Sequence, residues 1–360
     1  MKKFLGFCIA SGVLFSACKT DFKLTANYKE QMVIFGLLNQ SDSVQYIRIN
    51  KTFLGEGNAY SMALVHDSSN YKYLLNVKFE KWTLGGGTLV NTYVVDTTTM
   101  IPQTNSPFAN SPQVLYRVHT GVASPITSDF EYHLTVVNPV TGYTATAKTG
   151  LVVGYDSTGT SHSNGISFNI VTPDPYFTSA YNFYNLSIPF KIHWTTGTYG
   201  RIYNPILRIH YTEYDLSGAG TNKYVDKDFG NFTSPSTAGG EDQYTSMTWD
   251  EFKHFIPSAM GSSAGVSKRV ITTCEFIMNI GGDEFNTYMQ VNMPVSSITG
   301  EKPTYTNITN GIGLFSTRYT FDFHRMIKPV SNATLDNLAT DPISCPAKIA
   351  DHNGIVYTCP

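Results

Sequence analysis

The stretch VQYIRINKTF, residues 44–53, decides the fold class. Within it the apolar Ile47 and Ile49 alternate with the polar Arg48 and Asn50. Alternation with a period of two is typical of a β-strand that has one face on a core and the other face in solvent. The stretch therefore predicts a strand with Arg48 and Asn50 on its outward side.

Similar strand patterns surround this stretch, and turn signals separate them. An apolar run precedes it at residues 32–38, and alternating runs follow at residues 75–80 and 130–136. Gly85 to Gly87 and Pro139 to Gly142 are turn signals between such strands. Short strands with polar turns, spread over about 130 residues, are typical of a sandwich. We therefore expect residues 30–155 to form an immunoglobulin-like β-sandwich.

The second half of the chain continues the strand-like pattern. The Gly/Ser/Thr-rich residues 156–165 indicate a linker between two domains. A capping box at Thr248 and Glu251 predicts a short helix that ends near Pro257. We expect a second β-rich domain over residues 166–344, with one or two short helices, and a C-terminal tail over residues 345–360. Its strands are expected at residues 166–171, 186–194, 205–214, 270–280, 287–294 and 313–323.

The composition agrees with a mainly β protein. The chain has 360 residues, of which 14% are charged and 13% are aromatic. So few charges exclude a coiled coil and a highly charged disordered chain, and aromatic side chains suit a half-buried pleated surface. The formal net charge is −2 and there is no basic block, so the sequence shows no electrostatic footprint for nucleic acid.

The first residues have the form of an export signal. Lys2 and Lys3 precede an apolar run from Phe4 to Phe15, which is too short to anchor the chain across a hydrocarbon core of about 30 Å. Ser16 and Ala17 follow that run directly before Cys18, and this arrangement resembles a bacterial lipobox. The resemblance implies a signal peptide over residues 1–17, cleavage after Ala17 and a lipid anchor on Cys18. The alternative is an ordinary secretory signal.

An acylated Cys18 would make the membrane the first partner of the protein. Several acyl chains on one cysteine hold a protein firmly, whereas one chain binds only marginally. Residues 18–29 are then a tether between the anchor and the first domain. We expect the protein to be lipid-anchored at the outer membrane, and the sequence leaves open whether it faces the periplasm or the cell surface.

The other cysteines differ in their expected roles. Cys345 and Cys359 enclose a short polar loop, and export would place them in an oxidising compartment, so we expect a disulfide between them. The alternative is that they stay reduced. Cys274 lies in a strand-like run, where a buried structural thiol is expected. No C-x-x-C pattern is present, so neither a zinc knuckle nor a thioredoxin-like pair is supported.

Three blocks together resemble an uncharacterised lipoprotein family of Bacteroidota, a domain of unknown function. They are the lipobox at Cys18, the run VIFGLLN with DSVQYIRINKTF (residues 33–39 and 42–53), and TNITNGIGLF (residues 306–315). The resemblance implies an immunoglobulin-like sandwich that opens at the first run. It also implies a cell-envelope setting near TonB-dependent transporters, so such a transporter is an expected partner. The family implies no activity, cofactor or catalytic residue.

Three short strings invite a catalytic interpretation that their context opposes. Residues 281–285, GGDEF, match a diguanylate cyclase motif, but we expect a hairpin turn between two strands with Asp283 in solvent. Residues 261–265, GSSAG, match a nucleophile elbow, but the predicted helix precedes the string and a strand follows, which is the reverse of the required order. Asp226 and Asp228 could bind calcium, although a solvated turn is the simpler interpretation. We therefore predict no catalytic residue and no metal site.

An aromatic cluster is the remaining candidate for ligand binding. Tyr176, Phe177, Tyr181 and Tyr184 lie close together in the sequence, and aromatic faces can stack on sugar rings. Core packing explains such residues equally well. Overall we expect a lipid-anchored cell-envelope protein with a non-catalytic binding or assembly role, whose partner is an outer-membrane transporter or a glycan, and no cofactor. The rival prediction is an exported glycan-active hydrolase or carbohydrate-binding protein.

Overall fold

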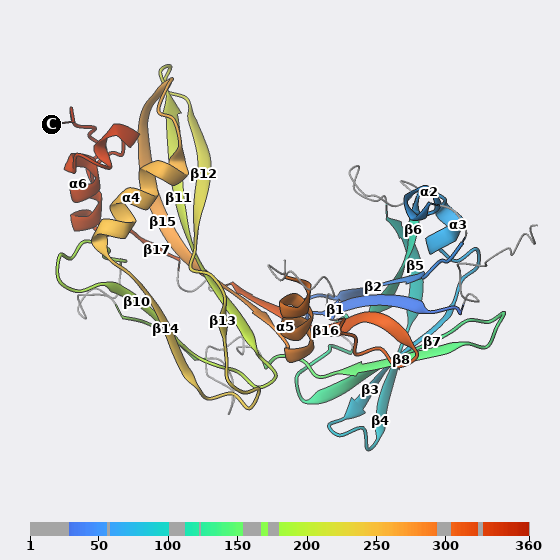
Figure 1. Ribbon diagram of the computed structural model, residues 1–360. Helices are drawn as coiled ribbons and strands as arrows, with labels where there is room; N and C mark the ends of the chain where they lie inside the picture. The colour runs from blue at the N-terminus through green and yellow to red at the C-terminus, as the bar shows by residue number, and fades with distance from the viewer. Residues whose placement is uncertain are drawn as a thin grey trace, which may run out of the picture.

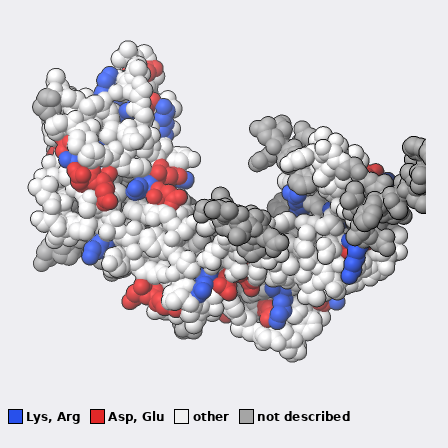
Figure 2. All heavy atoms as spheres, in the orientation of Figure 1, with Lys and Arg blue, Asp and Glu red and all other residues white. Residues whose placement is uncertain are grey.

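The computed structural model describes residues 29–55, 58–100, 112–121, 124–153, 167–171, 180–293, 304–322 and 327–359. Within these residues the protein is mainly β, as predicted, with strands in three sheets and a few short helices. Figure 1 shows a crescent with the N-terminal strands in one arm and the middle of the chain in the other. Figure 2 shows the hollow between the arms and sparse charges of both signs over the visible face.

The first sheet contains the strand that decided the fold class. β2 (Val44–Lys51) lies between β1 (Met32–Leu38) and β6 (Gln113–His119) and is antiparallel to both, and β6 pairs with β5 (Val95–Met100). Ile47 and Ile49 are buried, and Arg48 lies on the opposite side of the strand. The alternation therefore gave the correct orientation of this strand.

A second sheet closes the N-terminal sandwich. Its order is β4 (Leu89–Tyr93), β3 (Asn76–Thr83), β7 (Phe130–Val137) and β8 (Thr144–Thr149). Buried aromatic rings fill the space between the two sheets. Phe79 is 5.8 Å from Tyr132, measured between ring centroids, and 6.3 Å from Phe315. Since Phe315 comes from the far end of the chain, a distant segment completes this core.

That distant segment is β16 (Gly311–Asp322), which belongs to both arms. Its first half pairs in parallel with β1, starting with Met32 opposite Gly311. Gly313 has a φ of +119°, and a Cβ there would lie 2.0 Å from the carbonyl oxygen of Ile34, so only glycine lets β1 approach this closely. The second half of β16 pairs with β15 (Val266–Gly281) in the other arm.

The other arm is built on three long strands. β15 pairs with β11 (Ile202–Asp215), which pairs with β12 (Gly220–Asp228), and the short strands β13 (Phe232–Thr233) and β17 (Lys328–Pro329) join at the edges. A separate sheet of β14 (Asp242–Met247), β10 (Phe190–Thr195) and β9 (Ser167–Val171) lies in the same arm. Phe190 of β10 stacks on Phe276 of β15, with 5.8 Å between the ring centroids, so the two sheets share one core.

Helix α4 (Trp249–Met260) covers this core and begins where the sequence predicts. The Thr248 hydroxyl accepts a hydrogen bond from the Glu251 amide at 3.2 Å, and the Glu251 carboxylate accepts one from the Thr248 amide at 2.7 Å. The helix continues past Pro257 and buries Trp249 and Phe252. Helices α2 (Ala59–Ala63), α3 (His66–Ser69) and α6 (Asn332–Thr340) and the 3-10 helix η3 (Cys345–Ala347) lie elsewhere in the described chain.

The predicted hairpin at residues 281–285 and the predicted strand at residues 287–294 are wrong. Gly281 ends β15, and Gly282 caps helix α5 (Asp283–Asn292), which lies between the two arms in Figure 1. The Gly282 amide donates to the Thr317 carbonyl at 3.0 Å, and a Cβ on Gly282 would lie 2.7 Å from the Thr317 side chain. The two glycines therefore serve the close approach of this strand-to-helix junction to β16.

Most other predicted strands of the second half are present. Residues 205–214, 270–280 and 313–323 correspond to β11, β15 and β16, whereas the strand predicted from Leu186 begins at Phe190. β12 was not predicted, because it is an exposed edge strand without an apolar alternation. The predicted linker at residues 156–165 lies outside the described residues. None of the described helices combines the length and apolar character needed to cross a bilayer.

Candidate functional site

The outward side of β1, β2 and β6 forms the candidate site, which we name the Arg48 face. Strand registers place Phe35 and Leu115 opposite Arg48, Val33 opposite Asn50, and Arg117 opposite Tyr46. Directly paired residues of antiparallel strands share one face, and residues two apart on a strand share it too. The face consists of Val33, Phe35, Tyr46, Arg48, Asn50, Gln113, Leu115 and Arg117.

A hollow of about 280 Å³ opens on this face beside helix α3, and we name it the Arg48 hollow. This volume is just below the range of about 300–1,000 Å³ that is typical of small-molecule sites. Two cations and two amides line it together with apolar side chains. The lining residues are Val33, Arg48, Asn50, Lys51, Thr52, Phe53, Ser69 and Gln113.

Asn50 fixes the position of Arg48. The Asn50 Oδ1 accepts a hydrogen bond from the Arg48 Nε at 2.6 Å, and the Asn50 Nδ2 donates to the Ser69 carbonyl at 3.2 Å and to the Asn70 Oδ1 at 2.8 Å. Asn50 is buried, so helix α3 and the residue after it hold the Arg48 side chain in one orientation. The guanidinium is thereby held at the hollow before any ligand arrives.

Arg48 differs from the other arginine of this face. Arg117 donates two hydrogen bonds to Asp96, at 2.8 Å and 2.9 Å, and this bidentate pair holds the pKa of Asp96 below its usual value. Within the part of the chain that the structure describes, Arg48 has no carboxylate partner, and its hydrogen bond to Asn50 uses one of five N–H donors. Arg48 therefore keeps donors for an anion.

Gln113 lines the same hollow and carries an unused acceptor. The residue is only 4% exposed, and its Oε1, which is itself closed off from solvent, has no hydrogen-bond partner. A buried polar atom is normally bonded, so each orphan needs an explanation. An unused acceptor next to an unpaired cation is the combination expected where a ligand with both an anion and a hydroxyl group binds.

Two neighbouring hollows lie on either side of helix α5. The first, of about 350 Å³, is lined by Tyr46, Tyr288 and Arg318 among others, and Arg318 lies 3.5 Å from the Asp42 carboxylate. The second, of about 340 Å³, is lined by Asn204 and other polar groups that bond to one another, such as Asn204 with Asp228 at 2.7 Å. Arg318, which lines both of these hollows, pairs with Asp42, and neither hollow is lined by a described residue with a buried, unbonded polar atom. The Arg48 hollow therefore offers the stronger binding chemistry.

The predicted aromatic cluster does not form a ligand platform where it is described. Tyr176 and Phe177 lie outside the described residues. Tyr181 is 2% exposed and meets Phe276 edge to face, with 5.3 Å between the ring centroids, so the prediction of a binding role for it is wrong. Tyr184 is half-buried and meets Trp249 edge to face at 5.1 Å. Apolar packing in the second core explains both described rings.

The GSSAG loop and Asp226 have structural roles. In the GSSAG loop, Ser263 donates to the Pro346 carbonyl at 2.7 Å, and the Ser262 carbonyl accepts from Arg269 at 2.7 Å. Asp226 lies on β12 and not in a turn, and it accepts two hydrogen bonds from Arg208, both at 2.8 Å. These contacts position loops and strands, and they leave no free nucleophile or paired carboxylate in either string.

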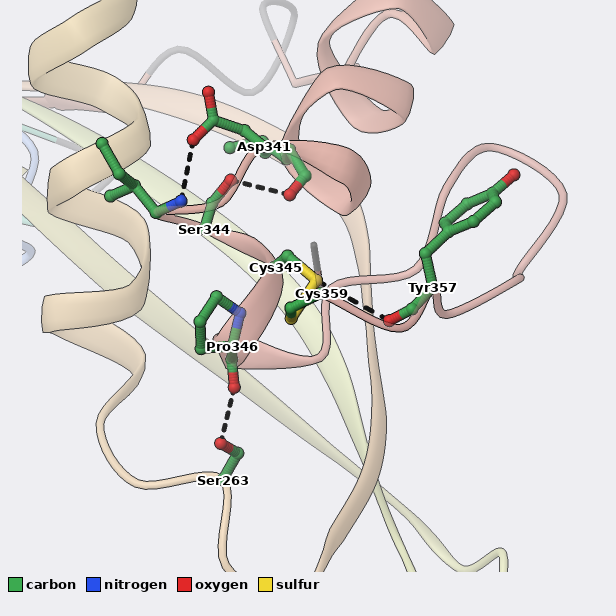
Figure 3. Close-up of a disulfide and its surroundings, with 9 residues drawn as sticks. Ser263, Asp341, Ser344, Cys345, Pro346, Tyr357 and Cys359 are labelled. Atoms are coloured by element: carbon green, nitrogen blue, oxygen red, sulfur yellow. Dashed lines mark hydrogen bonds between the residues drawn. A yellow bond between two sulfur atoms is a disulfide. The ribbon is translucent and has the colours of Figure 1, made fainter.

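The structure joins the two cysteines that were predicted to pair. A disulfide links Cys345 to Cys359, and Figure 3 shows it beside the hydrogen bond from Ser263 to Pro346. Cys274 is a buried free thiol, as its strand position predicts, and burial raises its pKa. Cys18, the predicted site of lipidation, lies outside the described residues.

One group of metal-ligating side chains comes together near this disulfide. Oxygen or nitrogen atoms of Asp336, Asp351 and His352 lie within 4.8 Å of one another. The Asp351 carboxylate already accepts hydrogen bonds from the amides of Asn353 and Ile355 and from the Tyr357 hydroxyl, and these bonds lower its pKa. Turn formation therefore explains this group without a metal.

Comparisons with known proteins give no relative. No family model matches the chain, and no curated protein matches it. The crystal structure of calcium-binding domain CBD12 of CALX1.1 is 11% identical, covers 81% of this chain and 98% of its own, and has a TM-score of 0.16. That of CBD12 from CALX1.2 is 10% identical, with 80% and 98% covered and a TM-score of 0.15. Likeness at this level says nothing about function.

Proposed function

We propose that the protein is exported and held at the outer membrane by acyl chains on Cys18, and that it has a non-catalytic binding role there. The observation that carries the anchoring is the place of Cys18, directly after Ser16 and Ala17 at the end of the apolar run from Phe4. Small residues before a cysteine at that point have the form of a lipoprotein signal.

Two features of the described chain support export and anchoring. The disulfide between Cys345 and Cys359 belongs to a class of bonds that persists in oxidising compartments. The sandwich begins with β1 at Met32, so the predicted tether of residues 18–29 separates the anchor from the first strand. About twelve residues span at most about 40 Å when fully extended. The proposal therefore places the sandwich close to the membrane.

The Arg48 hollow supports a binding role over the rival role as a glycan-active hydrolase. It combines an unpaired guanidinium, a lysine and an orphan acceptor, and these groups recognise a ligand without supplying a nucleophile or a general base. The residues of the GSSAG and GGDEF segments serve loop contacts and close packing. Binding is the function that the geometry supports best.

Acyl labelling tests the anchoring. The full-length chain, a Cys18→Ala variant and a Cys8→Ala variant are expressed in a bacterium fed with a labelled fatty acid. We expect label in the wild type and in Cys8→Ala, because Cys8 leaves with the signal, and no label in Cys18→Ala. The intact mass of the wild type should correspond to a chain that begins at an acylated Cys18. An unmodified thiol at residue 18, or a leader that is still attached, would overturn the proposal.

The proposed partner at the membrane is a transporter of the TonB-dependent class, by way of the family resemblance, with a glycan as the alternative. Affinity purification of the anchored protein in mild detergent tests this part. We expect co-purification of an outer-membrane protein with the wild type and its loss with Cys18→Ala, which cannot reach the membrane. Recovery of no membrane protein would count against a transporter.

A further inference from the structure

We propose that the Arg48 hollow binds a small acidic sugar, meaning a sugar ring that carries a carboxylate or phosphate group. The oxyanion lies on Arg48 and Lys51, and a ring hydroxyl donates a hydrogen bond to the Gln113 Oε1 after a rotation of the side-chain amide turns this solvent-inaccessible atom toward the hollow. This inference rests on the binding role proposed above and names the class of ligand. Four independent features of the hollow carry it.

The first feature is positive charge that the fold balances only in part. Arg48 has no carboxylate partner within the described residues, and Lys51 lines the same hollow with its Nζ 5.8 Å from the centre of the Tyr71 ring. The acid of helix α3, Asp67, is held by Lys72 at 2.9 Å and also interacts electrostatically with Lys51, but not with Arg48. A guanidinium presents a planar fork that matches the oxygens of a carboxylate or phosphate group. An anionic group is therefore the expected occupant of this end of the hollow.

The second feature is the orphan acceptor. Gln113 is only 4% exposed, and its Oε1 lacks a hydrogen-bond partner. Because an unsatisfied buried acceptor destabilises the fold, an apolar residue would be the better choice if stability alone mattered. A donor from a ligand explains why an amide stands there. A fully ionised anion such as sulfate has no donor for this atom, whereas a sugar hydroxyl group provides one.

The third feature is that side chains supply the recognition groups of the hollow. β2 pairs with β1 as far as Lys51 and with β6 as far as Arg48, and beyond Arg48 the Asn50 side chain bonds to Ser69 and Asn70. The polar groups that line the hollow include those of Arg48, Lys51 and Gln113, and the apolar walls at Val33 and Phe53 suit the C–H faces of a sugar ring.

The fourth feature is preorganisation. The buried Asn50 holds Arg48 at 2.6 Å and is itself held by Asn70 at 2.8 Å, and the Asn70 Nδ2 donates to the His66 carbonyl at 3.0 Å. Side chains that are already fixed lose little conformational freedom when a ligand binds. The chain of bonds from helix α3 to Arg48 therefore favours a binding site over a mobile surface arginine.

Calorimetric titration of the purified full-length protein in mild detergent tests the inference. The probes are D-glucuronate, D-glucose 6-phosphate and neutral D-glucose. We expect binding of at least one of the acidic sugars, and the stronger of the two identifies the oxyanion. D-Glucose should bind at least about tenfold more weakly, because it lacks a charge-assisted contact with Arg48.

Two variants with a matched control make the test specific. Arg48→Gln should weaken binding of the acidic sugar by about tenfold to hundredfold. Arg208→Gln, at a paired arginine on the other arm, should leave it unchanged. Gln113→Met should weaken binding while the melting temperature of the free protein stays the same or rises, since the orphan acceptor is removed.

Three outcomes would overturn the inference. They are no binding of either acidic sugar at millimolar concentration, equal weakening by Arg48→Gln and Arg208→Gln, and a Gln113→Met protein that melts earlier but binds normally. None of these results depends on acylation of Cys18. A failed titration therefore leaves the anchoring intact, and failed acylation leaves the binding result intact.

Discussion

Two sheet faces, one on each arm, each carry an arginine in the middle of a strand, and the two arginines have different partners. On the Arg48 face, the guanidinium meets an amide and an open hollow. On the outward side of β11, β12 and β15, Arg208 donates two hydrogen bonds to Asp226, lies 3.7 Å from the Glu275 carboxylate, and stacks over the Tyr224 ring at 4.1 Å. We name this second surface the Arg208 face.

The difference separates structural arginines from those available to a ligand. Arg208 has its charge balanced within its own sheet, so the fold alone explains it. Arg48 lacks such a balance within the described chain, and its neighbour Gln113 lacks a hydrogen bond as well. Polar groups that line a hollow and lack hydrogen-bond or ion-pair partners are a better guide to a binding site than aromatic rings are.

The largest loss of stability is expected where an arginine is both paired and buried. Arg269 is 1% exposed, lies 2.8 Å from the Glu213 carboxylate and donates to the Ala347 carbonyl at 3.0 Å. Arg269→Met should lower the free energy of unfolding by about 3–5 kcal/mol, because it leaves these acceptors unsatisfied. Urea denaturation measures the change. Lys223→Met, which removes the exposed partner of Glu213, is the control and should cost at most about 1 kcal/mol. Equal losses would contradict the role given to burial.

The disulfide should give the next largest effect, and only in the second arm. Cys345 and Cys359 are separated by 14 residues. Replacing both with serine should destabilise that arm by about 3 kcal/mol, because cross-linking a loop of this length restricts the unfolded chain. Denaturation of the wild type with and without a reductant gives the same comparison without mutation. An unchanged midpoint in both experiments would mean that the disulfide contributes nothing to the stability of this arm.

Replacing either of the two face arginines should lower stability only slightly. Arg208→Gln breaks a bidentate pair that is partly exposed, so a loss of up to about 1 kcal/mol is expected. Arg48→Gln should also cost about 1 kcal/mol, because the buried Asn50 Oδ1 loses its hydrogen bond from the guanidinium, although no ion pair within the described chain is broken. Thermal unfolding of both variants provides the measurement. A loss of several kcal/mol for Arg48→Gln would indicate a structural charge partner and would weaken its assignment to a ligand.

The smallest effect concerns an acceptor that is fully satisfied, in contrast to Gln113. The Glu241 carboxylate accepts hydrogen bonds from the hydroxyl groups of Ser236, Thr196 and Ser234, and these bonds lower its pKa from 4.5 to about 2. A lowered folded-state pKa contributes stability above about pH 4.5, which is lost as the pH falls toward 2.

Glu241→Gln should therefore be less stable than the wild type near neutral pH and should show a flatter dependence of stability on pH below 4.5. Denaturant midpoints measured across that window test this. The partly exposed position of the carboxylate keeps the expected difference small. Parallel pH profiles for the two proteins would show that the three hydroxyl groups do not favour the charged form.

The sequence allowed prediction of features that depend on neighbouring residues. The alternation around Ile47 placed Arg48 outward, and the capping box placed the start of α4 at Thr248. Helix α5 escaped prediction because its apolar Phe285 and Tyr288 sit in a short segment whose glycine-rich start resembles a turn. Composition alone does not separate a short helix from a strand.

Features that depend on distant pairing were beyond the sequence. The parallel pairing of β1 with β16 and the meeting of Arg48 with Gln113 depend on strand register between remote segments. Burial of Tyr181 depends on the position of Phe276, which lies far along the chain. The sequence therefore predicted only part of the candidate site, namely the outward orientation of Arg48 but not the residues around it.

A crystal structure of the protein soaked with the tighter-binding acidic sugar tests the central contrast most directly. We predict density in the Arg48 hollow, with the oxyanion on the guanidinium and a hydroxyl group within hydrogen-bond distance of the Gln113 Oε1, and no ligand on the Arg208 face. An empty Arg48 hollow at saturating ligand, or an ordered sugar on the Arg208 face alone, would contradict the account.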